Sequence, residues 1–302
     1  MFIKYRKWAR KLLFFGIFNY LKLILMPHTG EHKNPMKIFG MEPSTVCWLG
    51  YSVWPNVYLY RKKQKEAVIQ GIHEYLCQFF GSSINYTILS EKKTKELPPI
   101  LKGVSSSDIW IPDGKTQEEL ESYFNDYPIQ EYLKLSGKLN SRFIQNSVVY
   151  RSEYLKIDNC GNYGEEMLLN FKGRHLIFVT TNFRDSTIIQ FLNKWKTNQG
   201  FQNVNTLFIN LHLQNDNMIL FDKMLDNLKI NRNTDVRHLK PSEDALLVKW
   251  REMTEEMTLE SRDYLIRDGD GQGATVMTFP MFFLFVVWNS TENTHIMGSK
   301  NE

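Results

Sequence analysis

The sequence lacks the patterns that usually mark an enzyme, a metal site or a redox site. Its 302 residues include three cysteines, Cys47, Cys77 and Cys160, which are far apart and form no CxxC pair. An odd, scattered set of this kind favours reduced thiols in the cytoplasm or the nucleus. The chain also has no GxSxG, HExxH, P-loop or protein-kinase motif. We therefore expect no enzyme activity, no catalytic residues and no cofactor.

The chain also has only a small excess of one charge sign. The formal net charge is +4, and the sequence has no long run of Lys and Arg, no RNP-like aromatic motif and no zinc-finger spacing. So small an excess does not favour nucleic acid as a partner. With 42% hydrophobic and 23% charged residues, the composition is that of a globular protein.

Two short patterns resemble metal sites but fail on their spacing. His28 and His32 are four residues apart, without the third ligand that a metal site needs. The stretch DGDGQG resembles the start of a calcium loop, but position 12 counted from Asp268 is Phe279, where the loop needs Glu. We expect no metal, and the glycines of DGDGQG predict a turn.

The first 30 residues leave two alternatives for localisation. MFIKYRKWARK carries five positive charges, and an apolar run from Leu12 to Met26 follows, which is the charge order of a signal peptide. The run is short for a membrane span and contains Lys22, and no small-residue cleavage site follows it. These features favour an amphipathic helix in a cytoplasmic protein. A secreted or membrane-anchored binding protein is the alternative, and sequons at Asn85 and Asn289 agree with it.

Apolar residues recur with a regular period along the middle of the chain. Five of them follow each other at intervals of 22 residues: Leu89, Ile111, Leu133, Leu155 and Ile177. Most have an apolar neighbour two positions away, as in DIWIP, YLKLS, YLKID and LIFVT, and such alternation is typical of a half-buried strand. The interval lengthens to 32 residues at Ile209, and a weaker copy follows at Leu239.

Helix-like segments separate these predicted strands. They are Glu66–Phe80, Thr116–Tyr127, Arg184–Asn198, Asn215–Ile230 and Glu243–Arg262. Thr116 and Glu119 have the spacing of a capping box. One apolar face of the helix at 184–198 is made by Ile188, Phe191, Leu192 and Trp195. We expect such helical aromatics, with Phe80 and Phe124, to point into the core.

A strand and a helix in every 20 to 29 residues are typical of leucine-rich repeats. The predicted fold class is therefore α/β, an irregular leucine-rich-repeat-like solenoid with a parallel sheet and outer helices. Asp263–Trp288 predicts two or three antiparallel strands, joined by DGDGQG, that cap the solenoid. An ordinary α/β sheet with similar spacing is the alternative.

The order of several motifs resembles a known family. FKGRHL, a helix ending in QFLNKWK, a strand TLFINL, and RDGDGQGATV followed by FLFVVW resemble the F-box-associated domain, type 2. Upstream, HEYLCQFFG, DIWI, ESYFNDYP and YLKLSG fit the same order, so the resemblance covers roughly Lys65 to Trp288. It implies a non-enzymatic domain that recognises protein targets of a cullin-type ubiquitin ligase. In that family an N-terminal F-box docks the ligase adaptor.

The resemblance and the composition together predict three parts. Residues 1–55 form a basic and apolar segment in which the F-box is degenerate or missing, because the Leu-Pro start of an F-box does not occur there. Residues 56–289 form the F-box-associated repeat domain with its β cap, and residues 290–302 form a disordered tail.

A partner-binding surface is predicted on the sheet face opposite the core. If Leu133 and Leu135 point into the core, Tyr132 and Lys134 point away from it, because side chains alternate along a strand. The same reasoning adds Trp110, Tyr154, Lys156, Phe178 and Phe208. At the strand spacing of ~4.8 Å these residues would form a ladder of aromatic and basic side chains, the residue types that supply binding hot spots. Covering by the terminal segments or by another subunit is the alternative.

Overall fold

The chain folds into two compact units. The computed structural model describes residues 2–6, 20–28, 35–36, 46–49, 57–61, 65–80, 85–90, 95–101, 103–127, 129–181, 183–211, 231–239, 259–279 and 282–287. Unit 1 is Met1–Gly137 and unit 2 is Lys138–Glu302. This division differs from the predicted boundary at residue 55, because β1 (Phe2–Arg6) pairs with β6 (Asn85–Leu89) inside unit 1.

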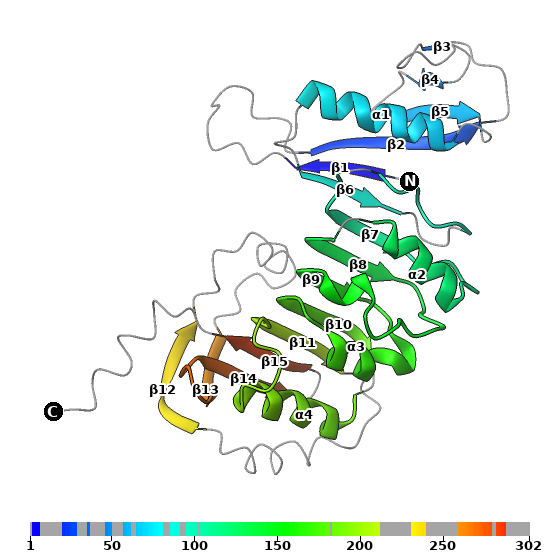
Figure 1. The fold of residues 1–302 in the computed structure, drawn as a ribbon. Helices are drawn as coiled ribbons and strands as arrows, with labels where there is room; N and C mark the ends of the chain where they lie inside the picture. Colours follow the sequence, from blue (N-terminus) through cyan, green and yellow to red (C-terminus); the bar gives the residue numbers. More distant parts are fainter. Residues whose placement is uncertain are drawn as a thin grey trace, which may run out of the picture. The chain divides into compact units, whose positions relative to one another are not determined.

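Unit 1 contains a mixed sheet with two described helices (Figure 1). Its further elements are β2 (Tyr20–His28), β3 (Pro35–Met36), β4 (Val46–Leu49), β5 (Val57–Arg61), α1 (Lys65–Phe80), β7 (Ser106–Trp110), α2 (Gln117–Asn125) and β8 (Tyr132–Ser136). The strand order is β3-β4-β5-β2-β1-β6-β7-β8. Strands β6, β7 and β8 run parallel, as do β2 and β5, whereas β1 is antiparallel to both of its neighbours.

The helix expected within Leu12–Met26 is wrong for its second half, which lies in strand β2. β2 has a strand on each side, since it pairs with β1 and with β5. A strand in the interior of a sheet accommodates a continuous apolar run such as LILM, which explains the pattern without a helix. The first half of that run lies outside the described residues.

Unit 2 begins with parallel strands and ends with antiparallel ones (Figure 1). Its elements are η3 (Val148–Arg151), β9 (Tyr154–Ile157), η4 (Gly161–Tyr163), α3 (Gly164–Asn170), β10 (His175–Thr181), α4 (Asp185–Lys196), β11 (Thr206–Leu211), β12 (Asn231–Leu239), β13 (Leu259–Ile266), β14 (Gly273–Phe279) and β15 (Phe282–Val287). Their order is β9-β10-β11-β15-β14-β13-β12. The α/β class with parallel strands and the C-terminal antiparallel strands are thus confirmed.

Other predicted elements have mixed outcomes. Leu239 lies in β12, which is antiparallel to β13, so it does not continue the parallel series. Residues 259–262 of the predicted helix Glu243–Arg262 lie in β13. The helix Asn215–Ile230, the rest of Glu243–Arg262 and the tail 290–302 lie outside the described residues.

One backbone arrangement recurs where a parallel strand begins. The carbonyl of Ser105, before β7, accepts N–H bonds from Glu131 and Tyr132 at the start of β8, at 2.8 and 3.1 Å. In unit 2 the carbonyl of Glu153, before β9, likewise accepts two consecutive N–H groups at the start of β10, at 2.8 and 2.9 Å. The carbonyl of Arg174 repeats this toward β11, at 2.8 and 3.1 Å. Each shared acceptor fixes where the next strand starts, and therefore its register.

The helices cover the sheet with the apolar faces that the sequence predicts. Thr116 caps α2, its side chain accepting from the N–H of Glu119 while the Glu119 carboxylate accepts from the N–H of Thr116. The capping box is thus confirmed. On α4 the four predicted core residues are fully buried. Trp195 packs edge-on against Phe285 of β15, with ring centroids 5.0 Å apart, so α4 fastens the antiparallel strands to the parallel ones.

The DGDGQG stretch is a tight turn between β13 and β14, as predicted. Gly269 and Gly271 adopt φ values of +93° and +70°, which side chains with a Cβ rarely adopt. Arg267 donates to the Asp270 carboxylate, with a shortest distance of 2.6 Å, and its guanidinium lies 5.1 Å above the Trp195 ring. That hydrogen bond lowers the pKa of Asp270. The turn is thereby tied to α4.

The loop before β10 approaches the loop before β9 so closely that glycine is required. A Cβ on Gly173 would lie 1.9 Å from the Ser152 carbonyl oxygen. The neighbouring N–H groups of Lys172 and Arg174 donate to Tyr150 and Glu153 at 2.8 Å each, so the backbone has little freedom to move aside.

We expect Gly173→Ala to lower the free energy of unfolding by about 3 kcal/mol, the upper range for overpacking. Gly200→Ala is the matched control, because a Cβ there meets its nearest atoms at 3.8 Å, an ordinary contact. That control should change stability by less than about 0.5 kcal/mol. Urea unfolding followed by circular dichroism measures both variants, and equal stabilities would contradict the close approach.

Candidate functional site

The ladder residues of unit 1 lie on one sheet face, but neighbouring residues contact or cover their side chains. Lys134 is in register with Asp108 on β7, and its ammonium lies 3.1 Å from the Asp108 carboxylate. Tyr132 is only 7% exposed. Trp110 is half-buried, and its ring lies 3.3 Å from where a Cβ on Gly137 would be. The face is therefore correct for these residues, but the expected exposure of Tyr132 is wrong.

The part of the ladder in unit 2 is mostly packed. Tyr154 is 4% exposed and lies next to His175, with ring centroids 6.1 Å apart. Burial raises the pKa of Tyr154 well above its usual range. Phe208 packs on Phe282 at 5.6 Å, beside the buried Leu284. Lys156 is half-buried. Tyr154 and Phe208 thus contribute to packing on the second face of the sheet.

Phe178 was assigned to the wrong face. It is 0% exposed and packs against Phe183, with ring centroids 5.0 Å apart. In the structure Leu155 is in register with Leu176, whereas the 22-residue interval aligned it with Ile177. A shift of one residue moves every side chain of a strand to the opposite face. The predicted ladder is therefore not a continuous exposed stripe.

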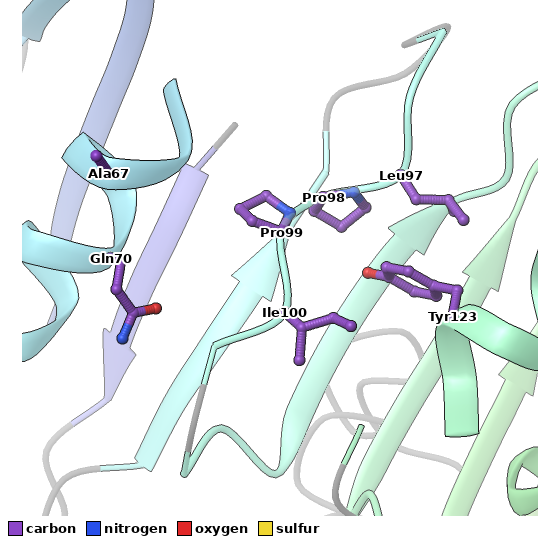
Figure 2. Close-up of a pocket in the computed structure, with 7 residues that line it drawn as sticks. All are labelled: Ala67, Gln70, Leu97, Pro98, Pro99, Ile100 and Tyr123. Carbon is purple, nitrogen blue, oxygen red and sulfur yellow. The ribbon is translucent and has the colours of Figure 1, made fainter. Parts of the chain in front are cut away.

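A pocket exists elsewhere in unit 1, and Figure 2 shows seven residues that line it. A pocket of about 610 Å³ opens between α1, the connection from β6 to β7, and α2. The described residues that line it are Ala67, Gln70, Leu97, Pro98, Pro99, Ile100 and Tyr123. None of these carries a charge, and Gln70 donates to Glu74 at 2.8 Å on the same helix. The described lining therefore suits a neutral group rather than an ion.

Two tyrosines hold the wall of this pocket in place. The Tyr123 hydroxyl donates to the Tyr127 hydroxyl at 3.0 Å, and the Tyr127 hydroxyl donates to the Pro99 carbonyl at 3.3 Å. Figure 2 shows the Tyr123 ring on α2 facing the proline rings. Burial raises the pKa of Tyr127 to about 12, and it raises that of Tyr123 further. Both phenols stay neutral near pH 7 and link α2 to the connection at 97–100.

Sequence reasoning did not identify this pocket, although one signal was present. Pro98 and Pro99 fix their own φ angles and restrict the residue before each of them to extended conformations. A Leu-Pro-Pro-Ile segment therefore forms a stiff apolar edge. Its partners on α1 and α2 are distant in the sequence, and no local pattern brings them together.

Other kinds of site find no support in the described part of the chain. No group of three or more His, Cys, Asp or Glu side chains there could hold a metal ion, and His32 lies outside that part. None of the described helices has both the length and the apolar character that a membrane span requires. Comparisons with protein-family models, with curated proteins and with solved structures gave no match.

Burial of Phe178 leads to a stability prediction. We expect Phe178→Ala to lower the free energy of unfolding by about 3 to 5 kcal/mol, because it removes a fully buried ring. Phe208→Ala makes the same change at a half-buried position on the other face and should cost clearly less. Urea unfolding of both variants measures the difference. A smaller loss for Phe178→Ala than for Phe208→Ala would contradict the burial of Phe178.

The tyrosine pair leads to a prediction about pH. Tyr127→Phe should cost about 1 kcal/mol at pH 8, because it removes a hydroxyl that both donates and accepts. The folded pKa of Tyr127, about 12, exceeds the unfolded value of about 10, so the stability it contributes is complete below pH 10 and is lost as the pH rises toward 12. The difference between wild type and Tyr127→Phe should shrink over that range. A difference that stays constant in urea unfolding from pH 8 to 12 would contradict the buried hydroxyl.

Proposed function

We propose that the chain is a non-enzymatic protein-binding module that holds an apolar anchor of its target in the pocket of unit 1. The observation that carries this proposal is a pocket of about 610 Å³ whose described lining residues carry no charge. Ligand pockets of about 300 to 1,000 Å³ are typically lined by apolar and aromatic groups, with few polar ones. The partner is a protein segment with an aliphatic or aromatic side chain, since the aliphatic wall, proline rings and Tyr123 offer it dispersion contacts.

The stiffness of the pocket supports this role. Proline rings lose no rotamer freedom on binding, and Tyr123 and Tyr127 are already held by hydrogen bonds. Binding to a wall that is ordered beforehand avoids part of the entropy cost of association. A single well-placed apolar anchor can then supply much of the binding energy.

The architecture that we propose for this module is an irregular leucine-rich-repeat-like solenoid. Its support is the shared-acceptor arrangement, in which Ser105, Glu153 and Arg174 each receive two N–H groups at the start of a following parallel strand. One supersecondary unit copied along the chain would repeat such a detail. From the resemblance to the F-box-associated domain we further propose that the target is selected for ubiquitination in the cytoplasm. The F-box would then be degenerate or supplied by another chain.

The proposal can be tested with a substitution that fills the pocket of unit 1. Ala67 is exposed on α1 and lines the pocket, so Ala67→Trp should place a ring in it. Gln78→Trp is the control, because Gln78 is exposed on the same helix and does not line the pocket. The full-length variants are expressed in cells, purified by affinity, and analysed by mass spectrometry, after circular dichroism confirms that they are folded.

We expect a defined protein partner that is captured by wild type and by Gln78→Trp, and at least about tenfold less by Ala67→Trp, which corresponds to about 1.4 kcal/mol. Co-purification of cullin-ligase subunits would support the ligase role. Equal capture by both variants would refute the pocket as the binding site. If the wild-type chain captures no defined protein partner, the proposal of a binding module is refuted.

A further inference from the structure

A second pocket, of about 270 Å³, lies in unit 2 and differs from the first in chemistry. It is bordered by the segment before η3, the C-terminal ends of α3 and α4, and the loops that lead into β10 and β11. Its lining residues are Gln145, Asn146, Leu169, Asn170, Phe171, Lys172, Lys194, Gln199, Gly200 and Phe201. All of them are among the residues that the structure describes.

The lining is basic and rich in hydrogen-bonding groups. Its described lining residues include two lysines, Lys172 and Lys194, and four residues with carboxamide side chains, but no Asp or Glu. Within the described residues neither ammonium has a carboxylate at ion-pair distance. By contrast, Arg174 is paired with Glu153 at 3.0 Å. Two lysines without an ion-pair partner among the described residues therefore border one concave surface.

The helix ends that border the pocket are capped by donors of the chain itself. Carbonyls at a helix C-terminus carry partial negative charge and would repel an anion. Here the last carbonyls of α4 already accept hydrogen bonds. Asn193 accepts from the N–H and the hydroxyl of Thr197 at 2.9 and 2.8 Å, and Lys194 accepts from the N–H of Gln199 at 2.9 Å. At the end of α3, Glu166 accepts from the Asn170 side chain at 2.9 Å. These capping donors reduce the partial negative charge that the helix ends present beside the two lysines.

The backbone of the pocket is fixed before any ligand arrives. The N–H of Lys172 donates to Tyr150 at 2.8 Å, which anchors one lysine to the neighbouring loop. Phe201 adopts a φ of +61°, which is uncommon for a bulky residue, and its ring packs on Phe191 at 4.8 Å. A strained residue persists only when its surroundings hold it, and such residues cluster at ligand sites.

We propose that this pocket binds a phosphate monoester. At pH 7 a phosphate monoester carries a charge of about −1.5 to −2, which two ammonium groups match, whereas a monocarboxylate would leave one of them uncompensated. The carboxamides of Gln145, Asn146 and Gln199 donate to the remaining phosphate oxygens or to hydroxyls of the ligand. The apolar atoms of Leu169 and Phe201 contact its carbon skeleton.

Two sources share this chemistry. One is a small phosphorylated compound, and the other is a phosphorylated side chain of a protein. The volume of about 270 Å³ is enough for a phosphate group with a short carbon skeleton, so both fit. The probes are glycerol phosphate for the first source and a short phosphoserine peptide for the second. Inorganic phosphate, glycerol and the unphosphorylated peptide serve as reference compounds.

The experiment is isothermal titration calorimetry on the full chain at pH 8 and low ionic strength, where screening is weak. Lys172→Gln combined with Lys194→Gln removes both charges and keeps the aliphatic stems nearly intact. Lys138→Gln combined with Arg142→Gln is the matched control, because both of these residues are exposed in unit 2 and neither lines the pocket. Circular dichroism checks that both variants remain folded.

We expect saturable binding of at least one phosphate monoester, weakened at least about tenfold by the pocket variant and less than about twofold by the control, since charge-assisted hydrogen bonds are lost only in the former. Stronger binding of the peptide than of glycerol phosphate identifies a protein side chain as the source, and the reverse order identifies a small compound. Absence of saturable binding by both probes, or an equal loss in the control, would overturn the proposal. So would binding of inorganic phosphate alone.

Discussion

The register between neighbouring parallel strands is the constraint on which the rest of the structure depends. It is set where each strand begins, at a carbonyl that accepts two consecutive N–H groups, as Glu153 does from Arg174 and His175. Once this start is fixed, alternation decides which side chains face the helices and which face away. On β10 that choice places Leu176 and Phe178 under the helices and Ile177 on the opposite face, and all three are buried. A slip by one residue would therefore exchange two well-packed surfaces, which makes slippage expensive.

Helices α1, α2 and α4 and the C-terminal antiparallel strands could be predicted because their signals are local. The Thr116–Glu119 capping box and the apolar face of α4 each involve residues close together in one helix. The chain turn after Asp268 is indicated by its glycines, which adopt positive φ. Register could not be predicted, because it depends on the length of the connection between strands. Leu155 is in register with Leu176, and Leu133 is in register with Ser107, so the connections do not keep the 22-residue period of the apolar residues. The period identified strands β6, β8, β9 and β10, but it placed Ile111 one residue beyond the end of β7 and assigned Phe178 to the wrong face.

The candidate sites were hidden from the sequence for a related reason. Both pockets are lined by connections and helix ends that only the fold brings together, such as the Leu97–Ile100 segment with Tyr123, or Lys172 with Gln199. Neither shows a period or a compact motif. The sequence does show two consecutive prolines, Pro98 and Pro99, and a small excess of basic residues. These features indicate a site only when the residues that surround them in the fold are known. The buried tyrosine pair, by comparison, has no signal at all, because Tyr127 reaches Pro99 across 28 residues of sequence.

The location of the pockets relative to the strands also explains why the sheet faces are poor places for recognition residues in this chain. Tyr132, Tyr154 and Phe178 are buried, so changing them to suit a new partner would lower the free energy of unfolding. The pocket residues belong to helices and to connections between strands, outside the strands themselves. Lys172 is anchored through its backbone to Tyr150, while its side chain is exposed and can change without disturbing that bond. A scaffold of this kind separates the residues that determine register from those that would contact the proposed ligands. The two pockets could therefore change their specificities independently, without any change in the strands.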